Sequence, residues 1–168
     1  GVRMDLEIPL HRIVDHDPWR QRGDGLGSRD TLGRLVRDQG LPLRRPSQFP
    51  RNGLLAARIA IVGLDDGWTP AFSQAVYQAN FVDDQDISDP SVLIPLIASV
   101  GAGPEHVLAA ANSDPVKARL KQHVAQARDQ GVFGAPSFVT ADGELFWGND
   151  RLEQALDWAV QHQSREHA

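Results

Sequence analysis

The segment that most constrains this chain lies near its C-terminal end and combines a proline-terminated loop, a hairpin and a helix start. The loop is Gly131-Val132-Phe133-Gly134-Ala135-Pro136, and period-two alternation follows over residues 137–140 and 144–147. This alternation predicts two strands, and Ala141-Asp142-Gly143 between them predicts the turn of a hairpin. A final helix is predicted to start at Asn149 or Asp150. Such a segment can offer a ligand free backbone groups and the positive end of a helix.

The middle of the chain, residues 52–130, predicts a block of helices. Apolar residues recur there at helical spacing, and proline opens most of the stretches. Asp89-Pro90 and Asp114-Pro115 each place a capping residue before a proline at the first helical position, a favoured pattern at helix starts. The predicted helices cover residues 54–63, 70–77, 90–100, a stretch from Pro104, and 115–131.

The N-terminal part begins with strict alternation of apolar and polar residues from Val2 to Leu10, which predicts an amphipathic strand. Residues 15–30 are polar and rich in glycine and predict a loop, whereas residues 32–36 predict a short helix ending near Gly40. The order is therefore strand, helical block, hairpin, helix. This order predicts a small α/β core into which a helical block is inserted.

Composition excludes several classes of protein. The chain has 168 residues, is 41% hydrophobic and carries a net charge of −5. These values are typical of one globular domain and argue against nucleic acid or an anionic membrane as a partner. Cysteine is absent, so this chain holds no disulfide, thiolate nucleophile or redox pair. With no apolar leader at its start, a cytoplasmic location is expected.

The residues of the C-terminal segment allow a functional and a purely structural interpretation. A cis bond between Ala135 and Pro136 would shape a ligand site, but only about 5–6% of such bonds are cis, so local sequence favours trans. Asn149 and Asp150 could bind an anion at the helix start, although simple capping is the commoner role of these residues. Trp147 is the best candidate for a pocket wall because it lies close to them in sequence.

Other groups of residues give little indication of a metal, nucleophile or phosphate site. His11, Asp15, His16 and Asp17 do not have the spacing of a closed metal site, so no metal is predicted. The serines lack the glycine pattern of a nucleophile elbow, and no phosphate-binding glycine motif occurs. The residues alone therefore leave the catalytic group unknown.

The C-terminal segment resembles the 2-hydroxychromene-2-carboxylate isomerase family. The matching residues are 131–138 and Phe146-Trp147-Gly148-Asn149-Asp150-Arg151-Leu152. Further matches are Gly40-Leu41-Pro42-Leu43-Arg44-Arg45-Pro46, Phe49-Pro50-Arg51-Asn52 and Asp86-Ile87-Ser88-Asp89-Pro90. That family is related to kappa-class glutathione transferases and to DsbA-like proteins. The resemblance implies a thioredoxin-like α/β fold with a core of residues 1–31 and 131–168 and a helical insertion of residues 32–130.

The resemblance also implies a glutathione-dependent isomerase that acts on a small aromatic carboxylate, usually as a cytoplasmic homodimer. Pro136 would then follow a cis bond, the Ala135 backbone would pair with the cysteinyl part of glutathione, and Asn149 and Asp150 would hold its γ-glutamyl end. In the family, a strand and a helix precede the strand that matches residues 2–10, with a catalytic serine between them. This incomplete N-terminus leaves that serine without a counterpart here.

Two other functions stay open at this point. A degenerate thioredoxin-fold module could bind a ligand or partner without catalysis, and the missing serine favours this alternative. A thiol oxidoreductase of the DsbA type is disfavoured because the chain contains no cysteine.

Overall fold

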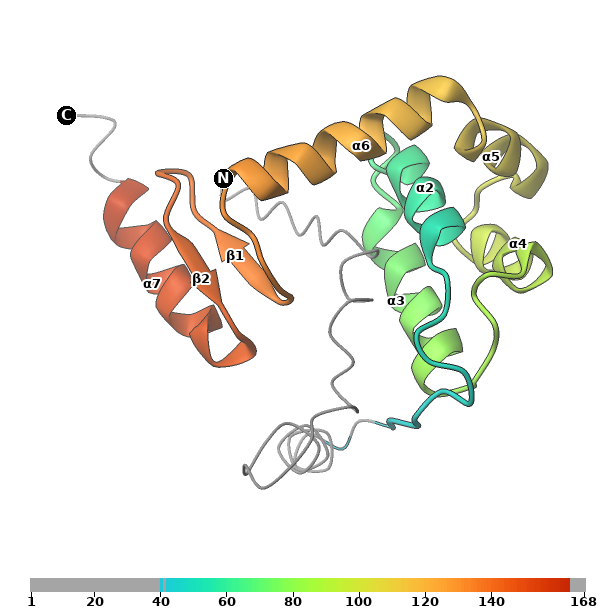
Figure 1. Cartoon of the computed structure of the whole chain (residues 1–168), viewed down its shortest axis with the longest axis horizontal. Coiled ribbons are helices and arrows are strands. Elements are labelled where there is room, and N and C mark those ends of the chain that lie inside the picture. The colour runs from blue at the N-terminus through green and yellow to red at the C-terminus, as the bar shows by residue number, and fades with distance from the viewer. Residues whose placement is uncertain (1–39, 41, 164–168) are drawn as a thin grey trace. The chain divides into compact units, whose positions relative to one another are not determined.

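The computed structural model describes residue 40 and residues 42–163, which form parts of two compact units (Figure 1). The first unit extends to Leu120 and the second begins at Lys121, so the division lies within one long helix. The strand predicted at residues 2–10, the loop at 15–30 and the helix at 32–36 lie outside the described residues. The predicted boundaries of the helical insertion, 32 and 130, stay a prediction.

The predicted helical block is confirmed in order and approximate extent. Its helices are α2 (Leu54–Gly63), α3 (Thr69–Phe81), α4 (Pro90–Ser99), α5 (Pro104–Ala111) and α6 (Asp114–Asp129). Asp89 caps α4 as predicted, since its side chain accepts the Ser91 N–H at 2.8 Å. Asp114, predicted as a cap, is instead the first helical residue, because the carbonyl of Ser113 already accepts the N–H of Lys117 at 3.1 Å.

The core of the first unit is formed where α2 packs against α3 and α5, and α4 packs against the latter two. Each of these helices contributes apolar side chains, so the interior is apolar and closely packed. The buried cluster comprises Ala56, Ile59, Phe72, Val76, Ala79, Ile87, Leu93, Ile97, Val107 and Ala111.

The turn between α2 and α3 depends on a glycine. The ring of Trp68 lies directly over Gly63, where an added Cβ would come within 2.4 Å of Trp68 Cε3. Trp68 also meets Phe72 edge-on at a centroid distance of 5.8 Å, and the hydroxyl of Thr69 donates to the carbonyl of Ala60. These contacts fold the start of α3 back onto α2.

A buried arginine anchors the segment before α2. The Arg51 side chain is 4% exposed and donates to the Asn80 side chain at 3.0 Å and to Asp84. Asp84 has a φ of +55° and also accepts the backbone N–H of Ser47 at 2.8 Å. The Asp84 carboxylate therefore holds both Ser47 and Arg51 of the extended segment close to the end of α3.

The second unit contains the predicted hairpin. Strands β1 (Ser137–Val139) and β2 (Leu145–Trp147) pair antiparallel, with Phe138 opposite Phe146. A 3₁₀ turn, η2 (Asn149–Arg151), leads into α7 (Leu152–Gln163), which packs against both strands.

The hairpin turn is tied to α7 by side chains. Phe146 is buried, and its ring lies 6.1 Å from that of Trp158, whose indole N–H donates to Asp142 at 2.8 Å. Trp158 in turn stacks on His162 at 4.0 Å. The hydroxyl of Thr140 also donates to Asp142, so this carboxylate joins the turn to the helix. Among the described helices, none has the length and apolar character required to cross a membrane.

We expect Gly63→Ala to destabilise the first unit by about 1–3 kcal/mol, because the added methyl overpacks against the Trp68 ring. Urea unfolding followed by far-UV circular dichroism measures this loss. Gly103→Ala is the matched control, since Gly103 has no atom near its Cβ position and its φ is −79°. Equal stabilities of the two variants would contradict the proposed contact.

The pKa of Asp84 is lowered to about 2, first because the Ser47 backbone N–H donates to the carboxylate and then because Arg51 does. A carboxyl group whose folded-state pKa lies below its unfolded value stabilises the folded state above the unfolded value. This contribution is lost as the pH falls through the folded-state pKa. We therefore expect the free energy of unfolding to fall as the pH drops from about 4 towards 2.

Asp84→Asn should flatten this dependence on pH, and asparagine tolerates the positive φ at this position. Urea midpoints measured across the acid range test the expectation. Asp66→Asn, which removes an exposed carboxylate of the same unit, should keep the wild-type slope. A full acid-induced loss in Asp84→Asn would exclude Asp84 as its source.

Candidate functional site

The hairpin brings the proline loop and the start of the last helix together. The N–H of Gly148 donates to the carbonyl of Pro136 at 3.0 Å, which extends the ladder by one pair beyond β1 and β2. The Ala135–Pro136 peptide bond is cis, whereas local sequence favoured trans. The predicted site residues at 135–136 and 149–150 are therefore neighbours in space.

Ala135 presents free backbone groups at this place. The residue is exposed, and among the described residues neither its N–H nor its carbonyl has a hydrogen-bond partner. The neighbouring carbonyl of Gly134 is occupied, because the Ser137 hydroxyl donates to it at 2.7 Å. Ala135 thus offers one donor and one acceptor side by side, as a strand edge does.

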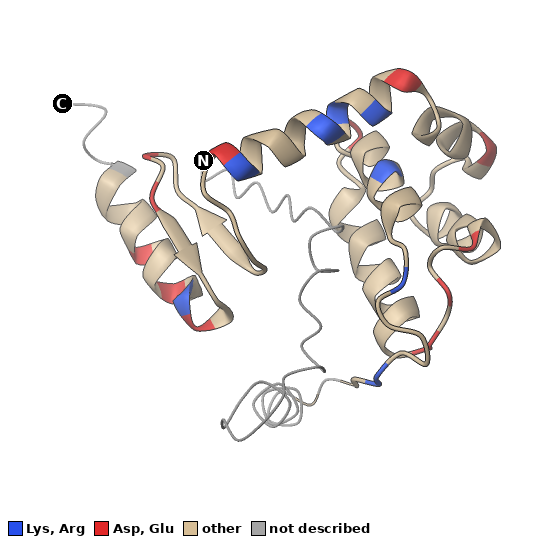
Figure 2. Cartoon of the chain, viewed as in Figure 1, with Lys and Arg blue, Asp and Glu red and all other residues tan. Residues whose placement is uncertain are grey.

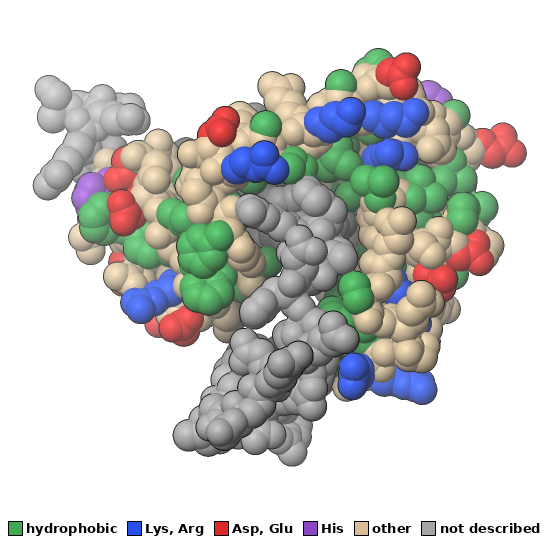
Figure 3. Space-filling view, viewed as in Figure 1, with side chains coloured by type: hydrophobic (Ala, Val, Ile, Leu, Met, Phe, Trp, Pro, Cys, Tyr) green, Lys and Arg blue, Asp and Glu red, His purple; other side chains and the backbone are tan. Residues whose placement is uncertain are grey.

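An aromatic pair stands next to Ala135. The rings of Phe133 and Trp147 lie 5.0 Å apart, and the two side chains are 59% and 53% exposed. Hydrophobic side chains reach the surface of this unit (Figure 3). The indole lies on Gly134, where an added Cβ would come within 2.5 Å of Trp147 Nε1. Sequence reasoning proposed Trp147 as a wall but gave Phe133 and Gly134 no role.

The start of the last helix is shaped by Gly148. This residue occupies the N-cap position with a φ of +114°, and an added Cβ would meet the Asp150 carboxylate at 2.5 Å. The expectation that Asn149 or Asp150 caps the helix is wrong, because the cap is a glycine without a side-chain bond. Both side chains are exposed, and the ion pair of Asp150 with Arg151 is long, at 3.8 Å. The carboxylate is therefore available to a ligand.

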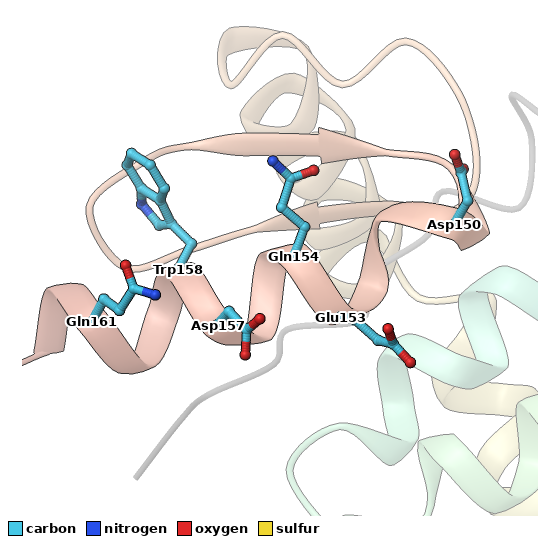
Figure 4. A pocket seen from close by; sticks show the side chains of 6 residues that line it. All are labelled: Asp150, Glu153, Gln154, Asp157, Trp158 and Gln161. Carbon is cyan, nitrogen blue, oxygen red and sulfur yellow. The ribbon is translucent and has the colours of Figure 1, made fainter.

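An open, acidic groove continues from Asp150 along α7 (Figure 4). Figure 2 marks the positions of acidic residues along the same helix. The lining residues are Asp150, Glu153, Gln154, Asp157, Trp158 and Gln161. The negative charge of these carboxylates disfavours the binding of anions along α7, except at the helix start itself.

Among the described residues, no group of three or more histidine, aspartate or glutamate side chains is arranged to hold a metal ion. The weak candidates His11, Asp15, His16 and Asp17 lie outside the described residues.

Comparison with known proteins decides the family. The family model of the DsbA-like thioredoxin domain matches residues 20–158. The chain belongs to the DsbA-like thioredoxin domain family. The predicted thioredoxin-like α/β fold with a helical part is thereby confirmed, as is the resemblance on which it partly rested.

Individual relatives of this DsbA-like protein agree with that assignment. It is 29% identical over 122 residues to a curated 2-hydroxychromene-2-carboxylate isomerase from Sphingobium xenophagum, a match that spans 73% of this chain and 61% of the relative. A solved structure of a 2-hydroxychromene-2-carboxylate isomerase has a TM-score of 0.69 and 22% identity, with 82% of this chain and 66% of that one covered. The chain thus spans less than two thirds of these relatives.

A second similar solved structure is the cytosolic disulfide reductase DsbM from Pseudomonas aeruginosa with GSH. Its TM-score is 0.60 at 17% identity, and the match covers 95% of this chain and 91% of DsbM. At this identity, and at that of the solved isomerase, the likeness shows the fold alone.

We expect Gly134→Ala to displace the Trp147 indole, because the new methyl would come within 2.5 Å of its Nε1 atom. In a ¹H–¹⁵N spectrum, the Trp147 indole resonance, assigned with Trp147→Phe, should shift while those of Trp68 and Trp158 stay in place. An unchanged Trp147 resonance would contradict the packing of the indole on Gly134.

Proposed function

We propose that this DsbA-like protein binds glutathione and is a glutathione-dependent isomerase of the 2-hydroxychromene-2-carboxylate isomerase type. The exposed, unpartnered backbone of Ala135 beside Pro136 is the observation that carries the proposal. The similarity to a curated isomerase supports the reaction class, and the fold shared with DsbM, solved with GSH, supports the ligand.

The chemistry of Ala135 fits a peptide ligand. A backbone N–H and carbonyl on one exposed residue complement the carbonyl and N–H of an extended peptide. Glutathione is a tripeptide, and its cysteinyl residue carries both groups. Pairing with Ala135 would fix the cysteinyl unit without any side chain of the protein.

The start of η2 fits the γ-glutamyl end, which carries an ammonium and a carboxylate. The exposed Asp150 carboxylate complements the ammonium, and the side-chain amide of Asn149 can bind either group. Backbone N–H groups at a helix start favour the carboxylate. Because Gly148 bonds to Pro136, this end of the ligand and its cysteinyl unit would be held at linked positions.

Bound glutathione would supply a thiol nucleophile that adds to the substrate, permits rotation about the weakened bond and leaves, so that no atoms are gained or lost. Trp147 and Phe133 would place an aromatic carboxylate against their exposed rings, beside Ala135. No described residue is assigned to support the thiolate, and the catalytic residue stays unassigned. We also propose that the protein acts in the cytosol, as DsbM does by its description, and as a homodimer.

A second candidate is a binding module without catalytic activity. One observation favours it: the described site consists of backbone groups, an amide, a carboxylate and aromatic rings, while the Ser137 hydroxyl is committed to Gly134. Such a site can bind glutathione without activating its sulfur.

We expect titration calorimetry to detect binding of reduced glutathione. Asp150→Ala should weaken this binding by a factor of roughly 1.4 to 5, since an exposed charge pair contributes roughly 0.2–1 kcal/mol. Asp157→Ala, an exposed residue two helical turns further along α7, should leave the affinity unchanged. The Ala135 amide resonance should shift during the titration.

Three outcomes separate the candidates. Conversion of 2-hydroxychromene-2-carboxylate that requires glutathione supports the isomerase. Binding with a shifted Ala135 amide but without conversion supports the module. The absence of detectable binding at millimolar glutathione overturns the glutathione site for this polypeptide.

A further inference from the structure

One basic side chain of the helical unit has no partner. Arg58 is the only charged residue of α2, and Figure 2 marks this single basic position on the helix. Among the described residues, the Arg58 side chain makes no hydrogen bond or ion pair, and its Nε atom is buried without an acceptor. A guanidinium does not lose its proton in a protein, so the charge stays. Arg58 is therefore a polar group that this part of the fold leaves unsatisfied.

The surrounding helices do not supply a carboxylate to this arginine. Residues 40–64 contain no aspartate or glutamate, so no acidic residue lies one helical turn from Arg58. Helices α3 and α5, which pack against α2, contain one acidic residue between them, Glu105, which is exposed in the first turn of α5. Asp65, which follows α2, is held by Arg119 through two hydrogen bonds of 2.7 and 2.9 Å. The positive charge of Arg58 thus remains without a counter-charge from these elements.

The guanidinium can be reached from solvent at its outer end. Arg58 is half-buried, and of its three unpartnered nitrogen atoms only Nε is fully enclosed. Nη1 and Nη2 therefore reach the surface, where their N–H groups form a fork that matches the two oxygens of a carboxylate. Because the positive charge is delocalised over the whole guanidinium, a carboxylate bound to this fork would also compensate the part of the charge at the buried Nε.

The neighbours of Arg58 on α2 are apolar. Leu54 and Val62 lie one turn before and one turn after it on the same face of the helix. Leu54 is 38% exposed, whereas Val62 is partly buried against the core. A ligand at the fork would therefore find apolar surface beside its charge, which favours an acid with an apolar body. One guanidinium also matches the single charge of a carboxylate better than the roughly 1.5–2 charges of a phosphate group.

We propose that Arg58 is a binding site for the carboxylate of an apolar monocarboxylic acid, with the exposed Leu54 side chain against the apolar body of the ligand. The Nη1 and Nη2 groups donate to the two carboxylate oxygens, and no bond is formed or broken. The inference does not rest on the proposed function, because it uses neither glutathione nor any residue assigned to hold it.

Titration of the full chain with benzoate, without glutathione, tests the site. In a ¹H–¹⁵N spectrum, the Arg58 Nε–H resonance, assigned by its loss in Arg58→Lys, should shift with benzoate and much less with benzyl alcohol, the uncharged analogue. Arg58→Gln should weaken benzoate binding more than about fivefold, which exceeds the effect of an exposed ion pair. Arg44→Gln is the matched control, because Arg44 is an exposed arginine of the same unit, and it should leave the affinity unchanged.

Three results of the titration would overturn the proposal. The first is an Arg58 resonance that does not move at tens of millimolar benzoate, and the second is an unchanged benzoate affinity in Arg58→Gln. The third is an equal shift with inorganic phosphate, which would indicate a general attraction of anions instead of recognition of a carboxylate. None of these results involves glutathione, so a failure of the proposed function is measured separately.

Unfolding by urea gives a second readout. Arg58→Met replaces the unpaired guanidinium by an apolar side chain, so without ligand this variant should be at least as stable as the wild type. Benzoate should raise the urea midpoint of the wild type but not that of Arg58→Met, because only the folded wild type binds it at this site. An equal rise in both proteins would assign benzoate to another site. A marked loss of stability in Arg58→Met without ligand would show that the guanidinium already has an acceptor, and either result would overturn the proposal.

Discussion

The hydrogen bond from the Gly148 N–H to the Pro136 carbonyl is the contact on which the candidate site depends. It extends the hairpin ladder beyond its three-residue strands and fixes the proline loop against the start of η2. Only glycine suits position 148, where φ is +114° and the Asp150 carboxylate occupies the space of a side chain. Without this contact, the free backbone of Ala135 and the carboxylate of Asp150 would both lie beyond the last paired residues of the hairpin, Ser137 and Trp147.

The two described units are stabilised by different means. The first has an apolar helical core and a buried arginine whose Nη1 and Nη2 groups donate to Ser47, Asn80 and Asp84. The second has few fully buried side chains and relies on a hairpin tied to α7 through Asp142 and Trp158. A unit of this kind keeps backbone groups accessible, because little packing covers them.

Local signals in the sequence predicted most of the fold. Asp89-Pro90 marks a helix start through a bond between adjacent residues, and alternation marks the hairpin, so both are visible in one short window. The contacts that shape the site are not local: Gly134 supports Trp147 only because the hairpin register brings them together. Arg51 and Asp84 are 33 residues apart, and nothing in either neighbourhood indicates their pairing. The cap at Gly148 was missed because Asn149 and Asp150 are the stronger capping residues.

A site built from backbone groups separates binding from catalysis. The N–H and carbonyl of Ala135 exist whatever side chains surround them, so they do not depend on a cysteine in the chain. Activation of a thiol nucleophile also requires a specific side chain beside the sulfur. That side chain has to come from residues other than those that hold the ligand. In the described part of the chain, the exposed groups of the candidate site are therefore suited to holding a ligand rather than to activating a thiol.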